Sequence, residues 1–194
     1  MVSVKNYGQI KVSPEEVYHF LGIRDPLARA ELLPDVEAVL RELDDLITPR
    51  LCYARFPLRA DGELLDLDFA RVKSRDLAKN LRGCREIVLI AATAGLEIDR
   101  AIAKYSRLSP SRALILQAVG AAAVESILDR ATEEFRAEGL CLRPRFSCGY
   151  GDLPLTLQTD IFAALDCPKS IGVSLTDSFL MTPTKSVSAI IGIE

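Results

Sequence analysis

The stretch from Arg143 to Pro154, RPRFSCGYGDLP, gathers the side chains best suited to chemistry. Arg145 carries a planar guanidinium that suits a carboxylate or a phosphate, and Tyr150 carries a ring face with a polar tip. Gly149 and Gly151 allow positive φ or a close approach of the backbone to a ligand. The stretch is typical of a binding loop or of a surface turn between two helices, and its composition leaves both open.

A second candidate is Glu125, which falls in the middle of a predicted long helix. Its neighbours on the helix are apolar, namely Ala121, Ala122, Val124 and Leu128. A carboxylate in such surroundings must be paired, hydrogen-bonded or protonated. The alternative is an exposed helix edge, since Asp129 and Arg130 follow one turn later.

The cysteine and histidine content narrows the chemistry further. The five cysteines are scattered without a C-x-x-C pair: Cys52, Cys84, Cys141, Cys148 and Cys167. With His19 as the single histidine, the sequence predicts neither a zinc site nor a Ser-His-Asp or Cys-His hydrolase, and it favours free thiols. His19 lies in a predicted helix, which favours a structural role. One alternative enzyme remains, with Cys148 as nucleophile and Arg145 holding an anionic substrate, but no general base is evident.

Composition and charge exclude several classes of protein. The chain has 194 residues, 49% of them hydrophobic and 26% charged, which is typical of a globular protein with a real core. A net charge of −3 argues against nucleic acid or an anionic membrane as the main partner. No run of about 18 apolar residues and no signal-peptide pattern is evident, so a cytoplasmic location is expected.

Local patterns predict the following elements. Helices are expected from Ser13-Pro14 to Gly22, from Pro34 to before Pro49, after a Ser74 cap, over 97–105, over 111–137 with a Ser109 cap, and over 155–165. Strands are expected over 2–7, in a hairpin of 51–58 with 64–69, over 87–93 as a doubly buried strand, over 171–176 and over 186–193. Asp66 and Asp68 would share one strand face, as a solvated pair or a paired-carboxylate site.

Strands at the start, middle and end of the chain, with helices grouped between them, predict an α+β fold. We expect a mixed or antiparallel sheet packed against the long central helix and several shorter helices. Residues 1–82 would form an N-terminal helix and β-hairpin portion, and residues 83–194 would form the core. Together these portions would make one compact domain.

Two ordered motifs in residues 140–193 resemble the activation (reactivation) domain of cobalamin-dependent methionine synthase. The run from Arg145 to Tyr150 resembles the R-x-x-x-G-Y signature of that family. The block from Ile171 to Phe179, followed by Met181, Pro183 and Ser186-Val187-Ser188, resembles the run that follows it, IGxxLTESxxMxPxxSVS. The resemblance implies the fold of that domain and a site for S-adenosylmethionine.

The resemblance also implies residue roles. Arg145 would bind the ligand carboxylate, and Glu125 would take the cationic end. The backbone of Phe146, Ser147, Cys148 and Gly149 would read the adenine edge, and Tyr150 would stack on the base or approach the sulfonium. Gly151 departs from the family, which has proline there, and the N-terminal third lacks the family's aspartate contact. A related domain that has lost ligand binding is therefore a further alternative.

The function implied by the resemblance is reactivation. In that family, the cobalt of the cobalamin-binding module occasionally oxidises to cob(II)alamin. Reductive methylation from S-adenosylmethionine then restores methylcobalamin. The D-x-H-x-x-G pattern of a cobalamin-binding module is absent from these residues. We therefore expect the cobalamin on a partner, a methionine synthase or other corrinoid protein, with an electron donor such as a flavodoxin.

Overall fold

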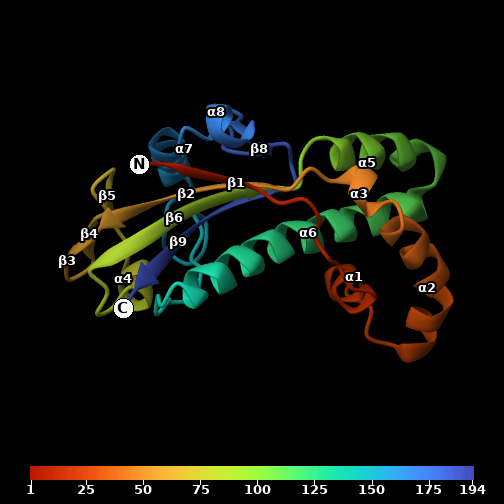
Figure 1. Ribbon diagram of the computed structural model, residues 1–194, viewed down its shortest axis with the longest axis horizontal. Coiled ribbons are helices and arrows are strands. Elements are labelled where there is room, and N and C mark those ends of the chain that lie inside the picture. Colours follow the sequence, from red (N-terminus) through yellow and green to blue (C-terminus); the bar gives the residue numbers. More distant parts are fainter.

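A four-stranded antiparallel sheet is the framework of the computed structural model, which describes all 194 residues (Figure 1). Its strand order is β1-β2-β6-β9. The strands are β1 (Ser3–Asn6), β2 (Arg50–Pro57), β6 (Glu86–Thr93) and β9 (Ser186–Ile193). The sheet therefore joins strands from the beginning, middle and end of the chain.

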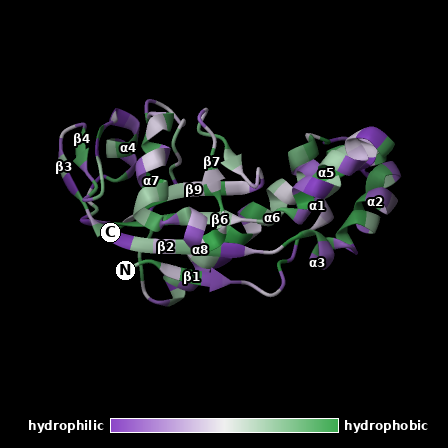
Figure 2. Cartoon of the chain, turned by 90° about the horizontal axis from the view of Figure 1, so that it is seen from above, coloured by the Kyte–Doolittle hydropathy of each residue, from purple (hydrophilic) through white to green (hydrophobic).

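Strand β6 shows why the sheet is buried on both faces. Ile87, Leu89 and Ala91 enter one hydrophobic core. The alternate residues Val88, Ile90 and Ala92 enter the other. Side chains alternate between faces with a period of two, so an uninterrupted apolar run serves two cores. Figure 2 shows this hydrophobic centre of the sheet and the more hydrophilic edge strand β1.

The first face is covered by α6 (Pro110–Ala137), and four further helices pack on α6 or on one another beyond the end of the sheet (Figure 1). These are α1 (Pro14–Leu21), α2 (Pro26–Leu40), α3 (Leu43–Leu46) and α5 (Glu97–Leu108). By length and apolar composition α6 is the one helix here that is able to cross a membrane, which the sequence did not lead us to expect. However, 61% of its apolar window is buried, as in the core helix of a globular domain.

The second face is covered by shorter elements. Helices α4 (Arg75–Asn80), α7 (Gln158–Leu165) and α8 (Cys167–Ile171) pack there with the short 3-10 helix Leu155–Leu157. Small antiparallel sheets flank them: β3 (Arg59–Asp61), β4 (Leu64–Asp66) and β5 (Arg71–Lys73) in one, and β7 (Ser174–Leu175) and β8 (Met181–Thr182) in the other. The predicted α+β class is confirmed, with antiparallel sheets around one long helix.

Several local predictions are also confirmed. Ser13 and Glu16 form a reciprocal capping box at the start of α1, and Gly22 ends the helix with φ 70°. Ser74 accepts a hydrogen bond from Leu77 N and so caps α4. Each signal lies within four residues of its partner, so the local sequence suffices to specify it.

Four predictions about elements are wrong. The helix placed after Pro34 begins at Pro26, because Asp25 caps it by accepting from Ala28 N, and Pro34 is tolerated inside it. The strand placed over 171–176 shrinks to β7, because Ile171 ends helix α8. Ser109 makes no side-chain cap on α6.

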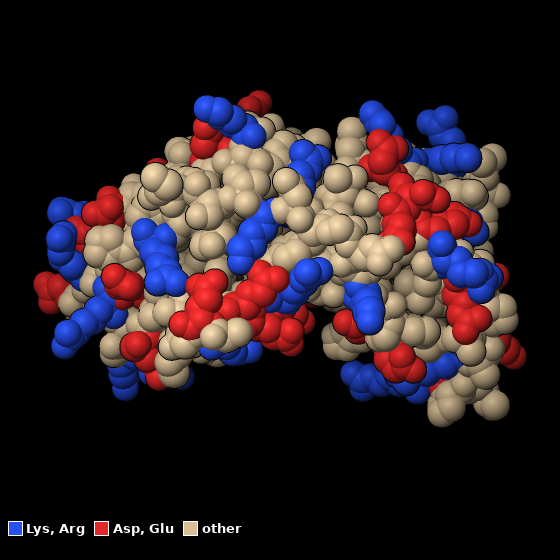
Figure 3. Space-filling view, viewed as in Figure 1, with Lys and Arg blue, Asp and Glu red and all other residues tan.

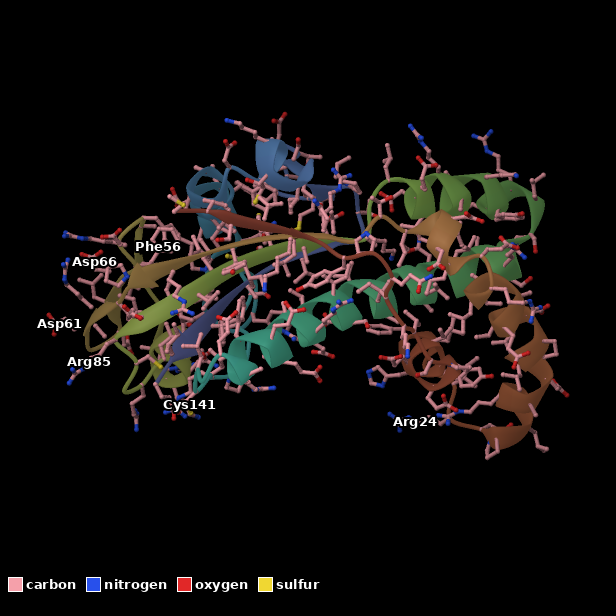
Figure 4. All side chains as sticks on the ribbon, in the orientation of Figure 1. Arg24, Phe56, Asp61, Asp66, Arg85 and Cys141 are labelled. Carbon is pink, nitrogen blue, oxygen red and sulfur yellow. The ribbon has the colours of Figure 1, made fainter.

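The fourth is the hairpin of 51–58 with 64–69. Strand β2 instead pairs along its whole length with β6, and the hairpin partner of β4 is the short β3. Just after β4, Asp68 has φ 73° and donates its backbone N–H to the carboxylate of Asp66, which also forms an ion pair with Arg71. Asp66 lies at the β3–β4 end of the molecule, opposite the helical end that Arg24 marks (Figure 4). These two carboxylates therefore form a solvated turn.

Candidate functional site

Residues 142–146 lie along the free edge of β9 as an irregular further strand. Leu142 and Phe146 form antiparallel bridges to Ile193 and Ile190. Phe146 and Ile190 exchange both backbone hydrogen bonds, at 2.9 and 2.8 Å. Pro144 donates no N–H, which an edge strand tolerates. The predicted loop is thus held by the sheet before it turns away.

Strand alternation places Arg145 on the face that α6 covers. Its Nη2 donates to Glu125 Oε2 at 2.8 Å, and its Nη1 donates to Asp129 Oδ1 at 2.7 Å. Glu125 and Asp129 lie one turn apart on α6, so both carboxylates reach one guanidinium. We call these three residues the Arg145 cluster. Glu125 is thus an ion-paired residue at the helix edge, with 42% of its side chain exposed.

The Arg145 cluster has unequal charges and a spare donor. Two carboxylates face one guanidinium, so the formal charges of the three side chains sum to −1. Both Nη atoms are engaged, and Arg145 Nε donates to no protein group. Figure 3 shows acidic side chains gathered over the C-terminal half of α6, beside basic ones. The arrangement suits a ligand that carries both a carboxylate and positive charge.

A hollow of about 230 Å³ opens beside the cluster. It is lined by Glu125, Leu128, Arg145, Phe146, Ser147, Tyr150, Val187 and Ala189. All the predicted site residues therefore line it except Cys148 and Gly149. A second hollow of about 550 Å³ shares Phe146 and Tyr150 with the first, and its wall also carries the charged side chains of Asp76, Lys79 and Arg143.

Tyr150 stands at the tip of a tight turn. Gly149 and Gly151, on either side of it, have φ of 87° and 54°, a region that glycine adopts without strain. Tyr150 N donates to Ser147 O, and Gly149 N donates to Leu153 O. The Tyr150 side chain is 70% exposed. Its ring is therefore presented to whatever binds at the rim of the hollow.

Asp152 clamps this turn to helix α4, a contact that the sequence did not reveal. Its carboxylate accepts from Ser74 Oγ at 2.6 Å, Arg75 N at 2.8 Å and Asp76 N at 3.1 Å. The hydrogen bond from Ser74, followed by those from the backbone, lowers the pKa of Asp152. Because the partners lie more than 70 residues away, no local pattern signals the clamp.

Gly151 fits closely against the same helix. A Cβ atom at this position would collide with the carboxylate of Asp76. A larger residue would displace the Asp76 side chain or the turn, and the φ of 54° at this position is closed to proline. The departure at Gly151 therefore has a structural reason in this chain.

Cys148 points away from the hollow and into the core. It is 8% exposed and packs in the core on the α7 face of the sheet. Burial raises the pKa of the thiol to about 11, so the thiolate is scarce at neutral pH. This geometry argues against the alternative in which Cys148 is a nucleophile.

The other titratable candidates also lie outside the hollow. All five cysteines are free, and Cys52 and Cys167 are buried side by side between β2 and α8. His19 is exposed on α1. No group of three or more His, Cys, Asp or Glu side chains is arranged to hold a metal ion. The chemistry of the site therefore rests on the Arg145 cluster and the turn at Tyr150.

Comparison with known proteins identifies a family and a similar solved structure. The family described as vitamin B12 dependent methionine synthase, activation domain, matches residues 76–193, which include α6, the edge segment and β9. Among solved structures, the chain is similar to one titled "Crystal Structure of the MetH Reactivation Domain bound to AdoHcy". The similarity has a TM-score of 0.71 at 17% identity and covers 99% of this chain and 78% of that one.

No curated protein sequence matches the chain. The structural similarity extends from β1 to β9, and at 17% identity it supports the fold alone. The family match is carried by the sequence itself and covers more than half of the residues. The chain therefore belongs to the activation-domain family of vitamin B12 dependent methionine synthases.

Proposed function

We propose that this chain binds S-adenosylmethionine in the hollow beside Arg145 and presents its methyl group to a cobalamin carried by another module. The observation that carries the proposal is the Arg145 cluster, which opens on a hollow formed by the signature segment. The similar reactivation domain is titled as bound to AdoHcy, the ligand without its methyl group. The role in reductive methylation follows from the family.

The charges and shapes of the site match the parts of the ligand. Arg145 Nε, which is free of protein partners, would donate to the ligand carboxylate, as in a charge-assisted hydrogen bond. Glu125 would accept from the ammonium group. Phe146 and Tyr150, which line both hollows, would contact the adenosyl portion where it extends beyond the smaller hollow.

The surface that meets the cobalamin module would be the rim around Tyr150. Leu155 and Leu180 are also exposed, at 41% and 65%. Leu155 lies beside Gly149, and Gln158 Nε2 donates to Phe179 O, which ties the loop before Leu180 to the start of α7. The side chains of Tyr150, Leu155 and Leu180 would contact the flat, largely apolar face of a corrin. We propose that these side chains form one apolar patch, the kind of surface that binds a partner.

The corrinoid, after one-electron reduction by an external donor, would supply the nucleophile that takes the methyl group and leaves S-adenosylhomocysteine behind. The chain's own residues would bind the ligand, orient its methyl group toward the rim and exclude water. We expect the reaction in the cytoplasm, with a flavodoxin-type protein as the electron donor. No second function is proposed, because the buried Cys148 offers no accessible nucleophile.

The proposal is tested in two steps. Calorimetric titration should first detect binding of S-adenosylmethionine to the purified chain. The chain is then mixed with the cobalamin-binding module of a corrinoid methyltransferase, the ligand and a chemical reductant, while the cobalamin absorption spectrum is followed. Return to methylcobalamin should be faster with the chain than without it. S-adenosylhomocysteine in place of S-adenosylmethionine is the control, because it has no methyl group to give.

Two results would overturn the proposal. Absence of ligand binding would assign the chain to a form of the domain that has lost its ligand. Binding without any change in the rate of methylcobalamin formation, measured with two different corrinoid proteins, would leave a ligand site but reject reactivation.

A further inference from the structure

We infer that Asp129 makes the site selective for the sulfonium form of the ligand, so that S-adenosylmethionine binds more tightly than S-adenosylhomocysteine. The inference rests on the proposed function and concerns the same site. It assigns a role to a residue that lies outside the signature segment and does not line the hollow. The two ligands differ by one methyl group and by the positive charge that this group confers on sulfur.

The charge count within the cluster is the first step. Glu125 alone is sufficient to neutralise Arg145, at a separation of 2.8 Å. Asp129 contributes a second carboxylate at 2.7 Å from the same guanidinium. The cluster therefore carries one negative charge more than its pairing requires.

The neighbouring charged groups do not cancel this excess. Arg143 is paired with Glu194 at 2.8 Å. Arg136, which lines the polar surface next to Asp129, is exposed and forms no ion pair with Glu125 or Asp129. The excess charge thus stays with the cluster.

The charges of the ligand are the second step. Its carboxylate and ammonium would be matched by Arg145 and Glu125. The remaining charge of S-adenosylmethionine is the sulfonium, and the excess negative charge contributed by Asp129 would be its counterpart. S-adenosylhomocysteine has a neutral thioether and would leave this charge unmatched. The Asp129 side chain is 61% exposed, so solvent weakens its attraction to the sulfonium. The attraction still acts over the few ångströms of the site, because that separation is shorter than the screening length of about 8 to 10 Å.

The consequence for the reaction is directional. Transfer of the methyl group removes the positive charge from sulfur, so the site would hold the product less tightly than the substrate. Because the site interacts more strongly with S-adenosylmethionine than with S-adenosylhomocysteine, methyl transfer favours release of the product. Asp129 does not line the hollow and acts on the ligand through Arg145 and through the electrostatic potential of its own carboxylate. It is therefore a positioning residue.

The experiment compares both ligands on three proteins by calorimetry: the wild type, Asp129→Asn and Glu133→Gln. Asparagine keeps an oxygen that accepts from Arg145 Nη1 but removes the charge. Glu133 is an exposed acid one turn from Asp129 without an ion pair, so Glu133→Gln is a matched control for the loss of one charge from α6. We expect Asp129→Asn to reduce the preference for S-adenosylmethionine by about three- to tenfold, mainly by weakening that ligand. The control should leave the preference unchanged, and added salt should reduce it in the wild type.

The outcomes separate this inference from the proposed function. If Asp129→Asn weakens both ligands equally, or neither, while the wild type binds S-adenosylmethionine, the inference fails and the proposed function stands. If Glu133→Gln lowers the preference as much as Asp129→Asn does, general surface charge explains the effect and the inference again fails. If the wild type binds neither ligand, the proposed function fails and this inference fails with it.

Discussion

Helix α6 carries two clusters of charged side chains that differ in kind. Near its C-terminal end, Glu134 accepts from Lys5 Nζ at 2.8 Å, Tyr7 Oη at 3.1 Å and Arg130 Nε at 3.3 Å. We call this the Glu134 cluster. It joins β1 and the segment after it to the helix. In the Arg145 cluster, by contrast, one cation is shared by two anions, and the Nε donor of that cation has no protein partner.

The difference shows when a charged cluster is structural and when it is a candidate site. The Glu134 carboxylate is saturated by three donors. Burial tends to raise its pKa, but the hydrogen bonds from Lys5 and Tyr7 outweigh that and lower it. No hollow described above includes Glu134. The Arg145 cluster has excess charge, an unused N–H and adjacent space, which are the features that a ligand requires.

The largest expected effect tests the Arg145 cluster as a site. Arg145→Ala should weaken S-adenosylmethionine binding by about 1.5 to 3 kcal/mol, the scale of hydrogen bonds to a charged group. Titration calorimetry measures the loss. Arg130→Ala, which removes an arginine from the Glu134 cluster, is the control and should leave affinity unchanged. Equal affinity in wild type and Arg145→Ala would remove Arg145 from the site.

The second prediction tests the Glu134 cluster as structure. Glu134→Ala should lower the free energy of unfolding by about 1 to 2 kcal/mol, because it leaves Lys5 and Tyr7 without their acceptor. Urea denaturation measures this, and S-adenosylmethionine affinity should not change. Glu133→Ala is the matched control, since that neighbouring acid has no ion pair. A loss of affinity in Glu134→Ala without loss of stability would reverse the comparison.

A smaller effect is expected at the clamp, in which Asp152 ties the turn at Tyr150, beside the Arg145 cluster, to α4. Asp152→Asn should weaken S-adenosylmethionine binding a few-fold, because the turn that holds Tyr150 is less firmly tied to α4. In the wild type, the pKa of Asp152 is lowered by folding. Its contribution is therefore present above the ordinary aspartate pKa and is lost as the pH falls through the lowered value.

Affinity measured from neutral pH down through the acidic range should accordingly fall more in the wild type than in Asp152→Asn, whose side chain does not titrate. Parallel pH profiles for the two proteins would show that the clamp does not position the turn.

The smallest effect is expected at Cys148. Cys148→Ala should leave ligand affinity and the rate of methylcobalamin formation unchanged, because the thiol faces the core. Thiol labelling should count five free cysteines after denaturation. In the native protein Cys148 should react slowly, and faster only as the pH approaches its raised pKa of about 11. Rapid labelling at neutral pH would restore the nucleophile alternative.

Much of the fold can be predicted from the sequence, because the signals that specify its helices and strands are local. The capping box of Ser13 and Glu16, the apolar run of β6 and the length of α6 each predict an element that the structure contains. The hairpin involving residues 51–58 was wrong because alternation predicts a strand but not its partner. Strand β2 had β1, β6 and β4 as possible neighbours, and burial of both sheet faces favoured β1 and β6.

For the site, the sequence by itself determined the chemistry of the turn: the guanidinium of Arg145, the ring of Tyr150 and the glycines that permit positive φ. The tertiary structure decided what these groups meet. Pairing of residues 142–146 with β9 turns Arg145 toward α6, where Glu125 and Asp129 lie 20 and 16 residues away in sequence. Packing of α4 brings Ser74 to Asp152 from 78 residues away. Backbone conformation depends on neighbouring residues, whereas these ion pairs depend on strand register and helix packing, which form only when the whole core is assembled.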